Sequence, residues 1–125
     1  MTPKAALKHY FGYTEFKAGQ KKVIDLLLEH KNTLALLPTG GGKSLCYQIP
    51  ALLEDGLTLV ISPLISLMKD QVDSLQQNGI PAAFINSSQE FETAKAVLTK
   101  ARRHELKLLY IAPERLENQF FLELL

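Results

Sequence analysis

The chain has 125 residues, of which 46% are apolar and 22% charged, and its formal net charge is +1. These values predict one ordinary globular domain, and they argue neither for nor against nucleic acid as a partner. No apolar run approaches the ~18 residues that span a bilayer, no secretory signal is expected after Met1, and the single cysteine excludes an intrachain disulfide. No cysteine–histidine spacing typical of a zinc site is present.

Hydrophobic periodicity predicts helices that alternate with short apolar strands. In chain order the predicted elements are a helix over 3–10, a helix over 20–30, a strand over 33–37, a helix from Lys43 to about Ile49, a strand over 57–61, a helix from Ser62–Pro63 to Gly79, a strand over 82–85, a helix from Ser87 through Ala101, a strand over 108–111, and a helix that opens at Pro113.

Several helix ends carry local signals. Thr2 is the expected N-cap of the first helix, with proline next to it. Pro50 is expected to end the third helix, and Ser87 and Glu90 have the spacing of a capping box. The residues expected to face the core from the helix that stops at Gly79 are Leu64, Leu67, Met68, Val72 and Leu75.

The alternation of strands and helices predicts an α/β fold with a mostly parallel sheet covered on both faces. In such sheets ligands bind at the carboxyl ends of the strands. The turns after the predicted strands 33–37, 57–61 and 108–111 are therefore the places to look for function, and the unusual residues lie there.

A glycine-rich turn lies between the predicted strand 33–37 and the helix that follows. Its backbone N–H groups can converge on an anion, and the helix N-terminus adds partial positive charge. Lys43 can reach the β- and γ-phosphates, and the Ser44 hydroxyl can bind Mg²⁺. The residues predicted to bind the triphosphate are Pro38, Thr39, Gly40, Gly41, Gly42, Lys43 and Ser44. Leu37 stands where the strict phosphate-loop pattern has glycine, so the match is to a variant of that pattern.

An aromatic and polar segment precedes this turn. The Gln20 amide offers a donor and an acceptor together, which matches the edge of adenine. The Tyr13 ring or the Lys17 cation can stack on a purine. The alternative is structural, because aromatic residues such as Phe16 at a helix start are usually packing.

Four blocks of the sequence, residues 11–20, 37–52, 60–72 and 108–116, closely resemble the RecQ family of ATP-dependent DNA helicases and stand in the same order. The resemblance implies a partial P-loop NTPase fold, the RecA-like three-layer sandwich of superfamily 2 helicases. It also implies that Lys43 and Ser44 are catalytic, with Ser44 on the Mg²⁺ of ATP. The segment implied to read adenine comprises Tyr13, Lys17 and Gln20. The family usually has Arg-Pro where this chain has Lys17-Ala18, so a weaker base contact is expected.

The resemblance further implies that two turns face single-stranded DNA. The residues of these turns are Ser62, Pro63, Leu64, Pro113, Glu114 and Arg115. From the residues alone, each turn is equally well explained as a helix cap without any phosphate contact.

The resemblance divides the chain into residues 1–30, the N-terminal helices with the adenine-reading segment, and residues 31–125, the first part of a RecA-like lobe. The Asp-Glu-x-His motif and the second lobe do not occur in the sequence. The chain is thus expected to be the ATP-binding portion of a 3′ to 5′ DNA helicase of repair and recombination, unable to hydrolyse ATP or unwind DNA alone. Its expected partners are single-stranded or duplex-junction DNA and the rest of the parent chain, with no membrane. If the source is a bacterium, the expected location is the cytoplasm, in association with the nucleoid.

Two other functions remain as alternatives. A small-molecule kinase would need an acceptor site and an arginine-rich lid, and no arginine cluster lies near the phosphate loop. A non-catalytic nucleotide- or DNA-binding module would explain the missing carboxylates.

Overall fold

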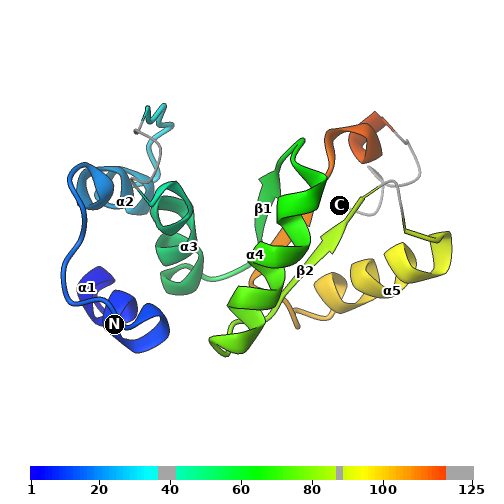
Figure 1. Ribbon diagram of the computed structural model, residues 1–125, viewed down its shortest axis with the longest axis horizontal. Helices are drawn as coiled ribbons and strands as arrows, with labels where there is room; N and C mark the ends of the chain where they lie inside the picture. Colours follow the sequence, from blue (N-terminus) through cyan, green and yellow to red (C-terminus); the bar gives the residue numbers. More distant parts are fainter. Residues whose placement is uncertain (37–41, 87–88, 118–125) are drawn as a thin grey trace. The chain divides into compact units, whose positions relative to one another are not determined.

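The computed structural model describes residues 1–36, 42–86 and 89–117, and the chain divides into two compact units, Met1–Asp55 and Gly56–Leu125 (Figure 1). The first unit is helical over its described residues, and the second contains a parallel sheet. Over these ranges, no helix combines the length and the apolar character that a membrane crossing requires. The functional division at residue 30 stays a prediction.

Four helical segments form the first unit: α1 (Pro3–Ala6), η1 (Leu7–Phe11), α2 (Gln20–Leu28) and α3 (Lys43–Leu53). The predicted N-cap is confirmed, because the Thr2 hydroxyl accepts a hydrogen bond from the Ala5 amide at 3.1 Å. The single helix expected over 3–10 instead changes at Leu7 to the wider hydrogen bonding of a π-helix, and it ends at Gly12, whose φ is 79°.

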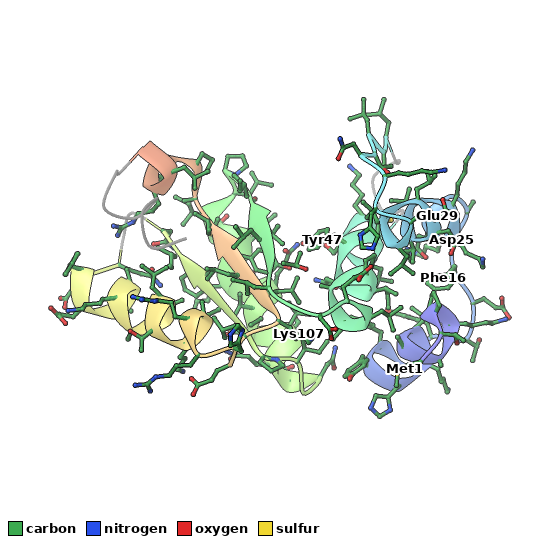
Figure 2. The ribbon with its side chains drawn as sticks, turned by 180° about the vertical axis from the view of Figure 1, so that it is seen from behind. Met1, Phe16, Asp25, Glu29, Tyr47 and Lys107 are labelled. Carbon is green, nitrogen blue, oxygen red and sulfur yellow. The ribbon has the colours of Figure 1, made fainter. Side chains whose placement is uncertain are left out.

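Apolar side chains of these helices pack into one core. Its buried members are Ala6, Leu7, Ile24 and Ile49, and the half-buried residues around them are Tyr10, Phe11, Phe16, Leu28, Leu45 and Leu53. Phe16 lies in the connection between η1 and α2 (Figure 2). Phe16 therefore packs against the core, as expected if the aromatic residues at this helix start have a structural role.

The strand predicted over residues 33–37 does not form at residues 33–36, and Leu37 lies outside the described residues. The four described residues have no regular secondary structure, and Leu34 and Leu36 are each 88% exposed. A strand is stable only where a neighbouring strand completes its backbone hydrogen bonds, and the described part of the first unit contains no other strand. The strand prediction is therefore wrong here.

Helix α3 continues past the end predicted at Pro50 and reaches Leu53. Proline inside a helix removes a backbone donor and crowds the preceding turn, at a cost of ~3 kcal/mol. The helix nevertheless continues, since the Glu54 amide donates to the Pro50 carbonyl at 3.0 Å and Ile49, Pro50 and Ala51 are buried. Packing thus overrides the local proline signal.

Three parallel strands form the sheet of the second unit: β1 (Thr58–Ile61), β2 (Ala82–Ile85) and β3 (Leu108–Ile111), in the spatial order β1-β3-β2. Ile61 and Ile85 both pair with Ile111, so the three carboxyl ends are level. The helical segments that follow the strands are α4 (Ile65–Gln77), α5 (Phe91–Arg102) and the 3-10 helix η2 (Pro113–Glu117). The predicted α/β class with a parallel sheet is confirmed.

The two long helices of this unit cover opposite faces of the sheet (Figure 1). The cluster under α5 comprises Ile85, Ala94, Leu98, Leu109 and Ile111. The buried side chains of α4 are Met68, Val72 and Leu75. Two further residues of the predicted apolar stripe, Leu64 and Leu67, are instead 56% and 47% exposed. They lie at the N-terminal end of α4, Leu64 as the N-cap and Leu67 in the first turn.

The face of the sheet that α5 covers is open at β1. Leu59 and Ile61 pair with Leu109 and Ile111, so all four side chains point to the same side. Leu59 is nevertheless 43% exposed and Ile61 55% exposed, whereas their partners on β3 are fully buried. This strip of β1 is an apolar surface that α5 does not reach.

Two predicted helix starts differ from the structure. Helix α4 begins at Ile65 with Leu64 as its N-cap, and the Ser62 hydroxyl accepts a hydrogen bond from the Leu64 amide at 3.2 Å in a turn before the helix. Glu90 is the N-cap of α5 and not a residue of its first turn, while Ser87 lies outside the described residues. The Ser62 hydroxyl thus forms a local hydrogen bond with the backbone in a turn and does not cap α4.

Two helices end on histidine in the left-handed conformation, His30 after α2 with φ 61° and His104 after α5 with φ 60°. After α5, the Glu105 amide donates to the Lys100 carbonyl at 3.0 Å, which closes a Schellman motif. Glycine is the usual residue at this position, and Gly79 takes it after α4 with φ 80°, as predicted.

Replacing His104 by glycine should therefore raise the free energy of unfolding by up to ~1 kcal/mol, because the side chain no longer opposes the left-handed backbone. Urea denaturation measures this change. The matched control is Arg103→Gly one residue earlier, where φ is −87° and glycine should destabilise. A loss of stability in His104→Gly would contradict the assignment.

Candidate functional site

The described part of the phosphate loop is the start of α3. Gly42 is the N-cap, with φ 71° and ψ 44°, and the Leu45 amide donates to its carbonyl at 3.2 Å. The Lys43 side chain is exposed and Ser44 is half-buried. Pro38, Thr39, Gly40 and Gly41 lie outside the described residues. The structure thus presents a lysine and a hydroxyl in the first turn of an 11-residue helix, whose amides favour an anion.

Gln20 joins the aromatic segment to this helix start. Its Oε1 accepts from the Lys17 amide at 2.7 Å, and its Nε2 donates to the Gly42 carbonyl at 3.1 Å, across 22 positions of sequence. The side chain is 1% exposed. Gln20 is therefore a buried link between two predicted nucleotide-binding segments.

The same contact explains why position 42 holds glycine. Its φ lies in the region that side chains avoid, and a Cβ atom built there would collide with Gln20 Nε2. Moving the Gln20 side chain away would break its hydrogen bonds to the Lys17 amide and the Gly42 carbonyl. The backbone of the phosphate loop and the Gln20 amide are therefore fitted to each other.

Two further residues predicted to meet the base are exposed. The Tyr13 side chain is 59% exposed and lies three residues before Phe16, which is packed into the core. Lys17 is exposed at the end of the same connection, and its amide is the one that Gln20 binds. An exposed aromatic ring and an exposed cation can each hold a planar base by stacking.

Cys46 is a packing residue. It lies on α3 and is 5% exposed, and burial raises the pKa of its thiol above the ordinary value. The thiol is therefore protonated at neutral pH and a poor nucleophile. This agrees with its interpretation as a small apolar residue.

The second predicted site lies in the other unit, at the carboxyl ends of β1 and β3. These strands are neighbours, and the Ser62 amide continues their ladder by donating to the Ile111 carbonyl at 3.1 Å. The two turns thus stand side by side at one edge of the sheet. The residues of these turns that are exposed are Pro63, Leu64, Pro113 and Glu114, and the half-buried ones are Ser62 and Arg115.

The Arg115 side chain forms hydrogen bonds with the protein backbone. Its Nε donates to the Asn86 carbonyl at 3.0 Å and its Nη2 donates to the Gln89 carbonyl at 3.2 Å. Sequence reasoning missed Asn86 and Gln89, because it passed over the turn after the predicted strand 82–85. The position of Asn86 in the sequence could have identified it, because it directly follows a strand, as Ser62 and Ala112 do.

For a metal ion, Ser44 supplies one hydroxyl oxygen. Over residues 1–36, 42–86 and 89–117 no group of three or more histidine, cysteine, aspartate or glutamate side chains is arranged to hold a metal ion.

Comparison with known proteins agrees with these features. The sequence profile of the DEAD/DEAH box helicase family matches residues 17–124. The chain is 55% identical over 124 residues to the ATP-dependent DNA helicase RecQ of Haemophilus influenzae, with 99% of this chain and 20% of the relative covered. It is 52% identical over 123 residues to RecQ of Bacillus subtilis, covering 98% of this chain and 21% of that protein.

A more distant relative is ATP-dependent DNA helicase Q1 of Rattus norvegicus, which is 46% identical over 115 residues, with 90% of this chain and 18% of the relative covered. The chain thus spans about a fifth of the length of the curated relatives it matches. The resemblance of the four sequence blocks to the RecQ family is confirmed.

Proposed function

The chain belongs to the DEAD/DEAH box helicase family, and from this premise we propose that it is the ATP-binding portion of a RecQ-type, ATP-dependent DNA helicase. The observation that carries the proposal is the Gln20 side chain, which joins Lys17 to Gly42 and so links the adenine-reading segment to the phosphate loop. The remaining lobes would lie in a longer protein of which this chain is a part.

In this proposal the nucleotide is held from both ends. Tyr13 and Lys17 stack on adenine. Gln20, whose buried amide holds Lys17 and Gly42, reads the edge of adenine by exchanging one of these contacts for a hydrogen bond to the base. The helix start at Gly42 binds the phosphates through backbone amides, together with Pro38, Thr39, Gly40 and Gly41 of the loop. Lys43 stabilises the charge that develops on the transferred phosphoryl group.

Mg²⁺ is the proposed metal. Ser44 would contribute its hydroxyl oxygen, and the ion would neutralise charge on the phosphate oxygens during hydrolysis. One hydroxyl oxygen from the protein is enough for this role, because Mg²⁺ takes its other ligands from water and phosphate oxygens.

Single-stranded DNA, or a junction of single-stranded with duplex DNA, is the proposed partner of the turns after β1 and β3. Support comes from their shared edge of the sheet and from the exposed positions Pro63, Leu64, Pro113 and Glu114. Backbone amides at such turns contact phosphates without reading sequence. The proposed activity is unwinding from 3′ to 5′ in DNA repair and recombination, and for a bacterial source the proposed location is the nucleoid-associated cytoplasm.

The test uses the full-length protein that contains this sequence. ATP hydrolysis is measured with and without single-stranded DNA, and strand separation with and without ATP. We expect hydrolysis that rises with DNA and separation that requires ATP. Binding of ATP or DNA without hydrolysis would favour the alternative, a non-catalytic nucleotide- or DNA-binding module.

The adenine-reading role of Gln20 has its own test. Gln20→Ala should reduce the preference for ATP over GTP, by ~1–3 kcal/mol if a buried hydrogen bond to the base is lost. The ratio of kcat/KM for the two nucleotides measures the preference, and the matched control is Gln76→Ala, at a glutamine of α4 that donates to the Ala82 carbonyl. An unchanged ratio would leave Gln20 with its structural role alone.

A further inference from the structure

Arg115 fastens two neighbouring turns of the sheet to each other. It lies on η2, which follows β3, and it donates to the carbonyls of Asn86 and Gln89 in the connection from β2 to α5. These partners are 29 and 26 positions away in sequence. Since β2 and β3 pair in register, with Ala112 donating to the Ile85 carbonyl at 3.0 Å, both turns stand at the carboxyl edge of the sheet.

The side chain of Gln89 forms hydrogen bonds with the backbone at the end of β2 and at the start of the connection that follows it. Its Oε1 accepts from the Asn86 amide at 3.1 Å, and its Nε2 donates to the Phe84 carbonyl at 3.0 Å. Asn86 itself is 3% exposed. Gln89 therefore fixes the start of the connection to the end of β2, and Arg115 fixes the same residues to η2.

The geometry uses the planar fork of arginine. Nε and Nη2 lie on one edge of the guanidinium, and each meets a different carbonyl oxygen. A lysine ammonium is a point charge on a flexible chain and cannot hold two carbonyls in this way. The interaction therefore depends on the shape of the side chain as well as on its charge.

We infer that Arg115 is a positioning residue for DNA binding, which acts by holding Asn86 and Gln89 against η2 and not by contact with a phosphate. This inference rests on the proposed DNA-binding function of the same edge of the sheet. It changes the role expected for Arg115 and adds the start of the β2–α5 connection to the parts that shape the site.

The experiment measures the affinity of the full-length protein for an oligothymidylate strand over a range of salt concentrations. Three variants are compared with wild type: Arg115→Lys, which keeps the charge, Arg115→Ala, and Gln89→Ala, which loosens the connection without changing charge. Arg103→Ala, at an exposed arginine after α5, is the matched control. Hydrogen exchange of the Asn86 amide, without DNA, reports on the connection directly.

We expect Arg115→Lys and Gln89→Ala each to weaken binding about tenfold, the effect of one lost hydrogen bond, with the wild-type salt dependence. The double variant Arg115→Lys with Gln89→Ala should bind no more weakly than either single variant, because both act on one turn. The Asn86 amide should exchange faster in each variant, and Arg103→Ala should match wild type.

A direct phosphate contact gives a different pattern. Arg115→Lys would then retain most of the affinity, and Arg115→Ala would lower the slope of log K against log salt by about 0.7, the loss of one phosphate contact on a single strand. Either result, or wild-type exchange at Asn86 in Arg115→Lys, would overturn the inference. Wild-type protein that fails to bind the strand would overturn the proposed function itself, and with it the role of Arg115 in DNA binding.

Discussion

Replacing Lys43 by alanine in the full-length protein should lower DNA-stimulated ATP hydrolysis by at least ~100-fold. The reason is electrostatic, because one preorganised cation beside the reacting phosphoryl group contributes about that much to the rate. Lys43 is exposed in the first turn of α3, so its loss should leave folding intact. The measurements are kcat with saturating DNA and the melting temperature of the same preparation.

The matched control for Lys43 is Lys95→Ala, at an exposed lysine of α5 that belongs to neither proposed site. It should hydrolyse ATP as wild type does. If Lys43→Ala retained DNA-stimulated hydrolysis, the assignment of residues 38–44 as the phosphate loop would fail, and with it the proposed enzyme.

Gly42→Ala should destabilise the first unit by ~3–4 kcal/mol and abolish detectable ATP binding. Two costs add: a left-handed backbone that alanine resists by ~1–2 kcal/mol, and displacement of Gln20, whose Nε2 occupies the space of the new Cβ. Gln20 is buried, so displacing its amide sacrifices hydrogen bonds to Lys17 and Gly42 that contribute ~1 kcal/mol each. Urea denaturation and a fluorescent ATP analogue measure the two effects.

Gly12→Ala separates these costs. Gly12 has φ 79°, close to that of Gly42, but a Cβ there would meet nothing within 4 Å. It should therefore show the backbone cost alone and keep ATP binding. In the double variant Gly42→Ala with Gln20→Ala, the collision is absent and the two losses should not add. Equal effects at positions 12 and 42 would remove the argument that Gln20 and the loop are fitted together.

The strands of the sheet could be predicted well because each one is marked by residues within or next to it in the sequence. Strands 82–85 and 108–111 appear at the residues predicted, since each is a short apolar run between turn residues. In the structure strand 108–111 is buried throughout and strand 82–85 at its two ends. The N-cap at Thr2 and the stop at Gly79 depend on single residues with strong backbone preferences, so they too are readable from sequence.

The failures have a common physical cause, which is that tertiary partners decide the outcome. Residues 33–36 have the alternation of a strand but no neighbour to pair with, and Pro50 ends no helix because its surroundings are buried. In the candidate site, sequence motifs predicted Gln20, Lys43 and Ser44, and their roles stay predictions. No motif could show that the Gln20 amide meets Gly42, because that contact joins segments 22 positions apart.

The strand order β1-β3-β2 also sets when the sheet can form during synthesis. β3 pairs with both other strands, and it is the last of the three to leave the ribosome. Until Ile111 has emerged, β1 and β2 have no partner in this sheet, and the apolar side chains of both strands remain unpaired in the nascent chain. Assembly must wait for one late segment to insert between two early ones, which is a slow, non-local step. The growing polypeptide therefore exposes two unpaired apolar strands for as long as the third is still being made.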